Sequence, residues 1–378
     1  MINPNENDVR WAAGIWPKIR AKMEAQCGRI GAEVPYTLVN GRRNDKMAKD
    51  LYWWTNGFWP GMLWLMYSDT NDQRYRSAAE KIEERFDEAL AGYEGLHHDV
   101  GFMWTLTSRL DYKLTGNARS RVRALHAANI LAGRYNPRGH FIRAWNMDRT
   151  GWIIIDCMMN IPLLYWASAE TGDPRYRYIA IEHADTSLKY LVRPDGSCNH
   201  IGVLDPHTGE LLDTPAGQGY ASGSAWSRGQ SWAIYGFALS YIHTGDKRYL
   251  EVSLAVARYV LKALARTAYV PPVDYLAPAD EPVKIDTSAG MIAAAGLLCL
   301  AGLENNRERD LCREGAMNIL QAIEAAYVDW DPETDFFVKM GSAQYHGKTE
   351  ELHVPLIYGD YFFIESVLKI LHPEMEIW

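Results

Sequence analysis

The stretch Thr171-Gly172-Asp173-Pro174-Arg175-Tyr176 decides the fold, because it ends one helix and begins another within one short turn. Glycine can take the left-handed conformation that closes a helix, aspartate can cap the following helix, and proline suits its first turn. The same signal recurs at residues 70–75, 115–120 and 244–249, and in a weaker form at 304–309. A turn repeated in this way predicts a series of helical hairpins.

Each turn joins an apolar segment to an amphipathic one. Helices that are apolar all round must be buried, whereas helices with one polar face can cover them. With the last helix of the chain, the apolar segments are residues 58–67, 102–114, 153–169, 232–242, 291–303 and 361–371. With the opening helix, the amphipathic segments are residues 9–27, 74–90, 119–131, 175–191, 248–264 and 308–326. The sequence therefore predicts six inner and six outer helices.

The whole chain is predicted to be all-α, a closed (α/α)6 barrel that forms a single domain over residues 1–378. No convincing run of alternating strand residues interrupts the helical pattern, and no low-complexity linker divides it. The alternative is an open solenoid built from the same hairpins.

Composition excludes several classes of partner. The formal net charge is -8, so the chain offers no general basic surface for nucleic acid or for an anionic membrane. The start of the sequence lacks the regions of a secretion signal, and no segment is uniformly apolar for ~18 residues. We therefore expect a cytoplasmic protein. The five cysteines are scattered without CxxC spacing, which favours neither a disulfide framework nor a zinc site.

Aromatic residues are abundant, with 14 Trp and 22 Tyr. Several of the Trp stand beside Gly, Asn, Arg or His rather than inside apolar runs, as platforms for the C–H faces of sugars would. The alternative is that the large rings fill a wide helical core.

The segments that lead into the inner helices carry the unusual polar and aromatic residues. These segments are residues 53–57, 97–101, 155–156, 226–230, 286–288 and 358–360. In a barrel with parallel inner helices they meet at one rim, where each helix N-terminus favours an anion by ~0.3 to 1 kcal/mol. An acidic protein can hold a carboxylate-bearing sugar in this way.

Asp156 lies in the apolar run 153–159, where burial opposes ionisation and should raise the pKa of its carboxyl group. A carboxyl group that stays protonated near neutral pH can act as a general acid. Asn160 follows four residues later and is expected to share its helix face. The alternative is a structural aspartate that caps a helix or binds backbone groups.

Asp99 follows His97 and His98 at a second transition from loop to helix. Its carboxylate can take part in chemistry, or it can simply cap the helix that begins at Phe102. A metal site made by these three adjacent residues is disfavoured, because adjacent side chains rarely converge on one ion.

Arg228 lies between Trp226 and Trp232, next to further hydrogen-bond donors. Its guanidinium group can bind a carboxylate or hydroxyl groups of a ligand. The alternative is an internal ion pair that holds adjacent loops.

At these residues the sequence resembles the unsaturated glucuronyl hydrolases, glycoside hydrolase family 88. The matching stretches are WWTNGFWPGMLWLMY, LHHDVGF, IIIDCMMNIPLLYWASAETGDPRY, SAWSRGQSWAIYGFAL and LIYGDYFFIE. They occur in order from about residue 53 to 366, so the resemblance covers most of the chain. Together these motifs are highly specific, whereas TGDPRY alone would indicate only a helical barrel.

The resemblance implies an (α/α)6 barrel that needs no metal ion or organic cofactor. It implies that Asp156 is the general acid and base and that Asp99 is its essential partner. The sugar-binding positions that it implies are Trp54, His98, Trp145, His200, Gln218, Arg228 and Trp232. One departure is Asn56, where some members carry aspartate, and it removes neither carboxylate. Residues 341–355 show no pattern that predicts a preference for sulfated sugars.

The substrate implied is an unsaturated oligosaccharide. Polysaccharide lyases leave a C4=C5 double bond on the uronic acid at the non-reducing end. In the hypothesis, Asp156 protonates C4 and then assists the addition of water at C5, while Asp99 holds ring hydroxyls and adjusts Asp156. The hemiketal then opens and releases the remaining saccharide, so water does not attack the anomeric carbon as in ordinary glycosidases.

Three other functions remain open from the sequence. The nearest is an unsaturated rhamnogalacturonyl hydrolase, which performs the same chemistry on pectin fragments. A sugar epimerase on the same barrel would be expected to rely on a pair such as His98 and His200. A non-catalytic carbohydrate-binding protein would need the aromatic rings but not a buried acid.

Overall fold

The computed structural model describes residues 4–303 and 307–378. In it, the repeated turn has the predicted conformation, a left-handed residue that ends one helix followed by a side chain that caps the next. Helix α8 (Pro162–Thr171) ends at Gly172, whose φ is 73°. The Asp173 side chain then accepts a hydrogen bond from the backbone N–H of Arg175 as α9 (Pro174–Leu191) begins. The same pair of caps recurs at Asn71-Asp72, Gly116-Asn117 and Gly245-Asp246. The weak signal at 304–309 lies partly outside the described residues.

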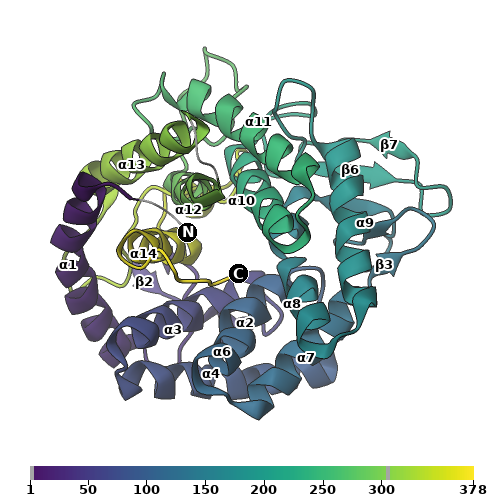
Figure 1. Cartoon of the computed structure of the whole chain (residues 1–378). Helices are drawn as coiled ribbons and strands as arrows, with labels where there is room; N and C mark the ends of the chain where they lie inside the picture. Colours follow the sequence, from purple (N-terminus) through teal and green to yellow (C-terminus); the bar gives the residue numbers. More distant parts are fainter. Residues whose placement is uncertain (1–3, 304–306) are drawn as a thin grey trace.

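The described helices form two concentric rings (Figure 1). The inner segments are α3 (Phe58–Thr70), the continuous run of α5 (Val100–Trp104), η2 (Thr105–Arg109) and α6 (Leu110–Thr115), then α8, α10 (Ser227–Thr244), α12 (Thr287–Leu303) and α14 (Ile357–Leu371). The outer helices are α1 (Glu6–Ile30), α4 (Gln73–Gly92), α7 (Ala118–Ala132), α9, α11 (Lys247–Leu264) and α13 (Arg307–Tyr327). Each inner segment contacts the next, and α14 contacts α3, which closes the ring. The (α/α)6 barrel is confirmed, and the open solenoid is wrong.

Burial separates the two rings as the hydrophobic pattern predicts. In α10, every residue from Ser227 to Ser240 is buried. In α11, by contrast, Tyr249 and Val256 are buried while Glu251 is exposed. Apolar burial stabilises a fold by ~25 cal/mol per Å², so the burial of the inner helices stabilises the barrel. Some of the abundant tryptophans do fill this core, including Trp59, Trp64 and Trp104.

The prediction that no strand interrupts the helices is wrong. The described chain contains the short hairpins β1 (Leu38–Val39) with β2 (Arg42–Arg43) and β3 (Tyr135–Asn136) with β4 (Phe141–Ile142). It also contains an antiparallel sheet in the order β5 (Trp152–Ile154), β6 (Ile201–Leu204), β7 (Leu211–Asp213). The remaining short elements are α2 (Lys46–Lys49), η1 (Trp54–Gly57), η3 (Ile155–Met159) and η4 (Thr349–Glu351).

The predicted inner helix 153–169 is therefore wrong in its first part. Ile153 and Ile154 pair with Gly202 and Ile201 of β6, as suits β-branched side chains on a half-covered sheet. The chain then makes the 3₁₀ turn η3, and α8 starts only at Pro162, a residue that favours the first turn of a helix. The consequence is that Asp156 stands on a short turn that follows a strand.

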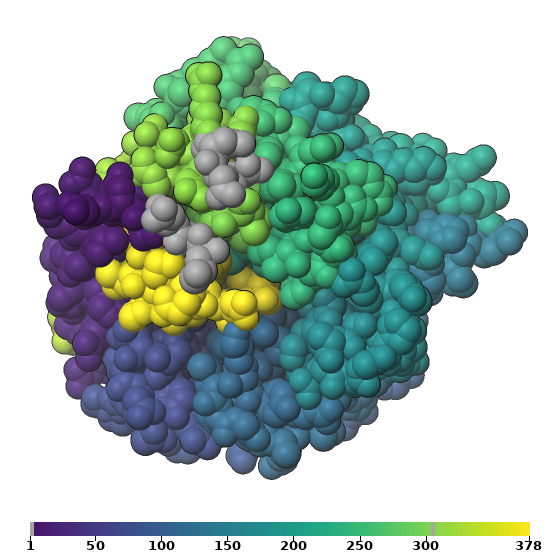
Figure 2. Space-filling model, viewed as in Figure 1, coloured from purple at the N-terminus to yellow at the C-terminus, as the bar shows by residue number. Residues whose placement is uncertain are grey.

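The C-terminal segment lies over the middle of the ring in the view of Figures 1 and 2. The Trp378 ring stacks on Phe362 with centroids 6.1 Å apart and planes 2° from parallel. Its indole N–H donates to Oε2 of the buried Glu365 at 3.0 Å. Within residues 4–303 and 307–378, no helical segment combines the length and the hydrophobicity that a membrane crossing requires.

Candidate active site

Asp99 and Asp156 come from two different inner segments and meet through Asn160. Asp99 is the residue before α5, and Asp156 lies in η3. The amide Nδ2 of Asn160 donates to Asp99 Oδ1 at 3.0 Å and to the backbone oxygen of Asp156 at 3.2 Å. The two aspartates are 8% and 9% exposed, so both are nearly buried but still reach solvent. The predicted pair therefore stands in one site.

Burial and the negative charge of Asp99 together raise the pKa of the Asp156 carboxyl group to about 7, and burial is the larger cause. The positive charges of His98 and Arg228 only partly oppose this effect. Oδ2 of Asp156 has no hydrogen-bond partner among the residues that the structure describes. Near neutral pH Asp156 is thus present in both its protonated and its ionised form, and its Oδ2 is available to a ligand.

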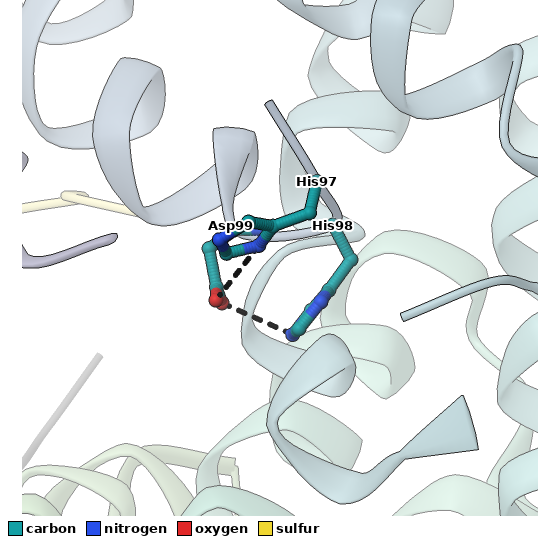
Figure 3. A group of neighbouring side chains, drawn as sticks. All are labelled: His97, His98 and Asp99. Carbon is teal, nitrogen blue, oxygen red and sulfur yellow. Dashed lines mark hydrogen bonds and ion pairs between the residues drawn. The ribbon is translucent and has the colours of Figure 1, made fainter. Parts of the chain in front are cut away.

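The carboxyl group of Asp99 is held in the ionised state. Burial works against its ionisation, but the charge of His98 and the hydrogen bonds of His97 and His98 outweigh burial and hold its pKa well below the usual range. Figure 3 shows the Asp99 carboxylate in contact with both rings. His97 Nδ1 lies 3.3 Å from Oδ2, and His98 Nε2 lies 3.1 Å from Oδ1. Two carboxyl groups whose pKa values are pushed apart are the usual arrangement for separate acid and base roles.

The alternative that Asp99 only caps a helix is wrong. Its side chain makes no capping hydrogen bond to α5 in the described part of the chain. The backbone N–H of Phe102 donates instead to Oδ1 of Asn160, at 2.7 Å.

The three adjacent side chains of Figure 3 do converge, contrary to the sequence argument. One ligand atom from each of His97, His98 and Asp99 lies within 4.8 Å of the others. The contacts between them are those of a carboxylate held by two imidazole rings, so they need no ion to explain them. The prediction that the enzyme needs no metal stays a prediction.

His98 lies beside the carboxyl group of Asp99, and His200 lies beside that of Asp156. Nδ1 of His98 contacts the backbone oxygen of Ala144 at 2.8 Å, which directs Nε2 toward Asp99. Nδ1 of His200 accepts a hydrogen bond from the backbone N–H of Gln218 at 3.0 Å, and Nε2 lies 3.6 Å from Asp156 Oδ2. Burial lowers the pKa of His200 to about 3, so its ring is uncharged near neutral pH. Nδ1 also lies 3.3 Å from the backbone oxygen of Ala216. Nε2 has no hydrogen-bond partner among the described residues and is available to a ligand.

Two half-buried tryptophans stand near these groups. The Trp54 ring lies 5.0 Å from Tyr358 and 5.5 Å from Phe102. The Trp145 ring lies edge-on to His98 at 6.3 Å. Because part of each ring is exposed, both can stack on a sugar.

Arg228 forms the internal ion pair that the sequence left as an alternative. It is 1% exposed, and its Nη1 donates to Asp286 Oδ2 at 2.8 Å and to the backbone oxygen of Ser342 at 2.7 Å. Nη2 donates to the backbone oxygen of Ala343 at 2.6 Å, and Nε2 of Gln218 donates to the same oxygen, also at 2.6 Å. Arg228 and Gln218 therefore both anchor the segment that contains Ala343.

Trp232 is not brought to the surface of the site. It is fully buried, and its ring packs on Phe102 at 5.0 Å and on Phe362 at 5.5 Å. Trp226 instead lies beside His200, with ring centroids 4.2 Å apart. Trp226 flanks Arg228 in the sequence, but it is not among the sugar-binding positions that the resemblance implies.

Similarity to known proteins extends over most of the chain. Residues 32–264 match the model of the family described as Glycosyl Hydrolase Family 88. An unsaturated glucuronyl hydrolase from Bacillus sp. (strain GL1) is 35% identical over 350 residues, which are 90% of this chain and 92% of that protein. An unsaturated chondroitin disaccharide hydrolase from Streptococcus pneumoniae is 33% identical over 84% of this chain and 81% of its own length.

Similarity extends to the solved structures. The crystal structure of the unsaturated glucuronyl hydrolase from Bacillus sp. GL1, described as responsible for the degradation of glycosaminoglycan, superimposes with a TM-score of 0.88. The identity is 33%, and the superposition covers 97% of each chain. This chain is therefore a glycoside hydrolase and belongs to Glycosyl Hydrolase Family 88.

Proposed function

We propose that the enzyme removes the 4,5-unsaturated uronic acid from the non-reducing end of polysaccharide-lyase products by hydrating its C4=C5 double bond. One observation carries the proposal: Asp156, with a pKa of about 7, stands in the same site as the ionised Asp99. The names of the relatives support the same class of substrate.

The proposed chemistry begins with transfer of the Asp156 proton to C4. The ring oxygen donates electrons into the C4=C5 bond, so protonation at C4 leaves positive charge shared between C5 and that oxygen. The ionised Asp99 stabilises this charge, and it cannot itself be the acid because it carries no proton. The Asp156 carboxylate then takes a proton from water as the water oxygen bonds to C5. The hemiketal opens, and the bond to the remaining saccharide breaks at C1.

Substrate binding is proposed for the groups around the two aspartates. Trp54 and Trp145 offer partly exposed rings for stacking, and His200 offers Nε2 to a sugar hydroxyl. His98 acts by holding the Asp99 carboxylate, since its two ring nitrogens contact Ala144 and Asp99. Arg228 and Gln218 act by holding the segment at Ala343. The contribution of Trp232 is proposed to come from support behind Phe102.

The test is a panel of lyase-generated unsaturated disaccharides from chondroitin, hyaluronan, heparin and rhamnogalacturonan. Turnover is followed by loss of the ultraviolet absorbance of the conjugated double bond. We expect turnover of at least one glycosaminoglycan product, and a loss of about 10²- to 10⁴-fold in kcat for Asp156→Asn. The control is Asp246→Asn, at an exposed helix cap, which should keep full activity.

Other outcomes would reject the proposal in defined ways. Turnover of the rhamnogalacturonan product alone would assign the enzyme to pectin fragments. Full turnover by Asp156→Asn, with loss on replacing His98 or His200, would favour an epimerase. Tight binding of every disaccharide with no loss of absorbance would indicate a binding protein.

A further inference from the structure

Asn160 makes three hydrogen bonds with its side chain although it is fully buried. Oδ1 accepts from the backbone N–H of Phe102 at 2.7 Å, and Nδ2 donates to Asp99 Oδ1 at 3.0 Å and to the backbone oxygen of Asp156 at 3.2 Å. A backbone N–H can only donate, and an ionised carboxylate and a carbonyl can only accept. The orientation of the amide is therefore fixed by its partners.

The backbone around Asn160 is packed too closely to move independently. A Cβ atom added at Gly101 would lie 2.3 Å from the Cα of Asn160 and 2.4 Å from its backbone oxygen. Glycine thus allows the first turn of α5 to touch the end of η3. Because Asp99 immediately precedes that turn, its position relative to Asp156 depends on this contact.

We propose, on the basis of the proposed function, that Asn160 is a positioning residue that holds Asp99 and Asp156 in one catalytic geometry. Oδ1 of Asp99 takes one hydrogen bond from Asn160 and lies 3.1 Å from His98 Nε2. A neutral amide donor adds no charge to the site, so it fixes the ionised carboxylate without cancelling it. The charge of Asp99 then remains available to stabilise the cation formed from the substrate and to keep the Asp156 proton in place.

A purely structural role is the competing explanation, because Asn160 also binds the N–H of Phe102. Asn160→Asp separates the two roles. The introduced carboxyl group can still accept from Phe102, but it lacks the two amide hydrogens that go to Asp99 and Asp156. Asn160→Ala removes all three bonds. Gln26→Ala is the control, since Gln26 is also a fully buried amide and donates to a backbone oxygen, that of Thr334, but lies on the outer helix α1.

The experiment measures kcat and KM of these variants and the wild-type enzyme from pH 5 to 9, with helix content as the test of folding. We expect Asn160→Asp and Asn160→Ala to lower kcat by about 10- to 100-fold, as suits loss of a hydrogen bond to a charged group, with KM within about threefold. Gln26→Ala should keep kcat.

The pH dependence of activity distinguishes a positioning role of Asn160 from a purely structural one. At low pH the introduced carboxyl group of Asn160→Asp can donate its own proton to Asp99, and at high pH it ionises and repels Asp99. Its activity relative to wild type should therefore fall as pH rises. Asn160→Ala introduces no group that titrates, so the activity of this variant relative to wild type should not fall as pH rises.

Several results would overturn the role of Asn160. The first is a kcat of Asn160→Asp within threefold of wild type at every pH. The second is an equal loss of kcat in all three variants. The third is a loss of helix content in both Asn160 variants. Each is compatible with the proposed function as long as Asp156→Asn is inactive. Conversely, full turnover by Asp156→Asn would reject the proposed function whatever Asn160 does.

Discussion

Asp156 and Asp99 are both nearly buried, yet their surroundings shift the pKa values of the two carboxyl groups in opposite directions. Oδ2 of Asp156 has no hydrogen-bond partner among the described residues, whereas the Asp99 carboxylate contacts His97, His98 and Asn160. The difference comes from local partners and not from depth of burial. It provides one proton donor and one fixed negative charge at neutral pH.

The pH dependence of turnover follows from the state of Asp156. The protonated form is the active acid, and its pKa is about 7 in the folded enzyme. The protonated fraction is nearly complete below that pH and is lost above it, so kcat/KM should fall about tenfold per pH unit on the alkaline side. A profile measured on a neutral unsaturated substrate, such as a methyl ester, tests this without ionisation of the sugar. A flat profile up to pH 9 would contradict the assignment.

The sequence predicts the burial of Asp156 better than it predicts the ion pair of Arg228. The apolar run around Asp156 lies next to it in the chain, so burial could be foreseen. The partner of Arg228 is Asp286, on the segment that leads into another inner helix, and no local pattern identifies it. The contacts of His97 and His98 with Asp99 depend on the directions of the two imidazole rings, which cannot be inferred from three adjacent positions in the sequence.

Among the elements, η3 decides the geometry of the acid. It follows β5, and its residue Met158 is packed against Gly236 in the middle of α10. The apolar character of residues 153–169 was foreseen, but the switch from strand to 3₁₀ turn to helix was not. Apolar runs fit a buried strand and a buried helix equally well, and only pairing with β6 distinguishes them.

A substitution at Gly236 tests this packing. A Cβ atom there would lie 2.8 Å from the backbone carbon and oxygen of Met158, so Gly236→Ala should displace η3. We expect it to lower the free energy of unfolding by about 1 to 3 kcal/mol and to lower kcat as Asp156 moves. Chemical denaturation and steady-state kinetics measure both effects.

The matched control for Gly236→Ala is Gly14→Ala, on the exposed side of α1. A Cβ atom at Gly14 meets no described atom within 4 Å, so this change should be neutral or stabilise the helix by about 0.5 to 1 kcal/mol. Equal stability for the two variants would show that η3 does not depend on the contact with α10.

On the scale of the whole molecule, the repeated turn predicts the two rings of helices, because its caps are encoded in adjacent residues. Closure of the barrel depends instead on the contact of α14 with α3, which are far apart in the sequence. The sequence favoured the closed ring through its alternation of six apolar and six amphipathic segments, and the resemblance to a family implied the same fold. The thiols of Cys27, Cys157, Cys198 and Cys299 are free, as their scattered positions suggest.

The candidate active site is formed by the segments that lead into the inner helices. The segments that lead into the inner helices bring together residues from distant parts of the chain, while the C-terminal segment packs inside the ring around Phe362. A single domain over residues 1–378, a cytoplasmic location and independence from any cofactor stay predictions.

The most direct measurement of the central claim is nuclear magnetic resonance of the reaction in deuterium oxide, which follows the vinylic C4–H signal together with the released saccharide. If Asp156 protonates the double bond, the vinylic signal disappears no later than the saccharide is released, and deuterium enters one face of C4 only. Release of saccharide while the vinylic signal of the uronic acid persists would show attack at the anomeric carbon and would contradict the account.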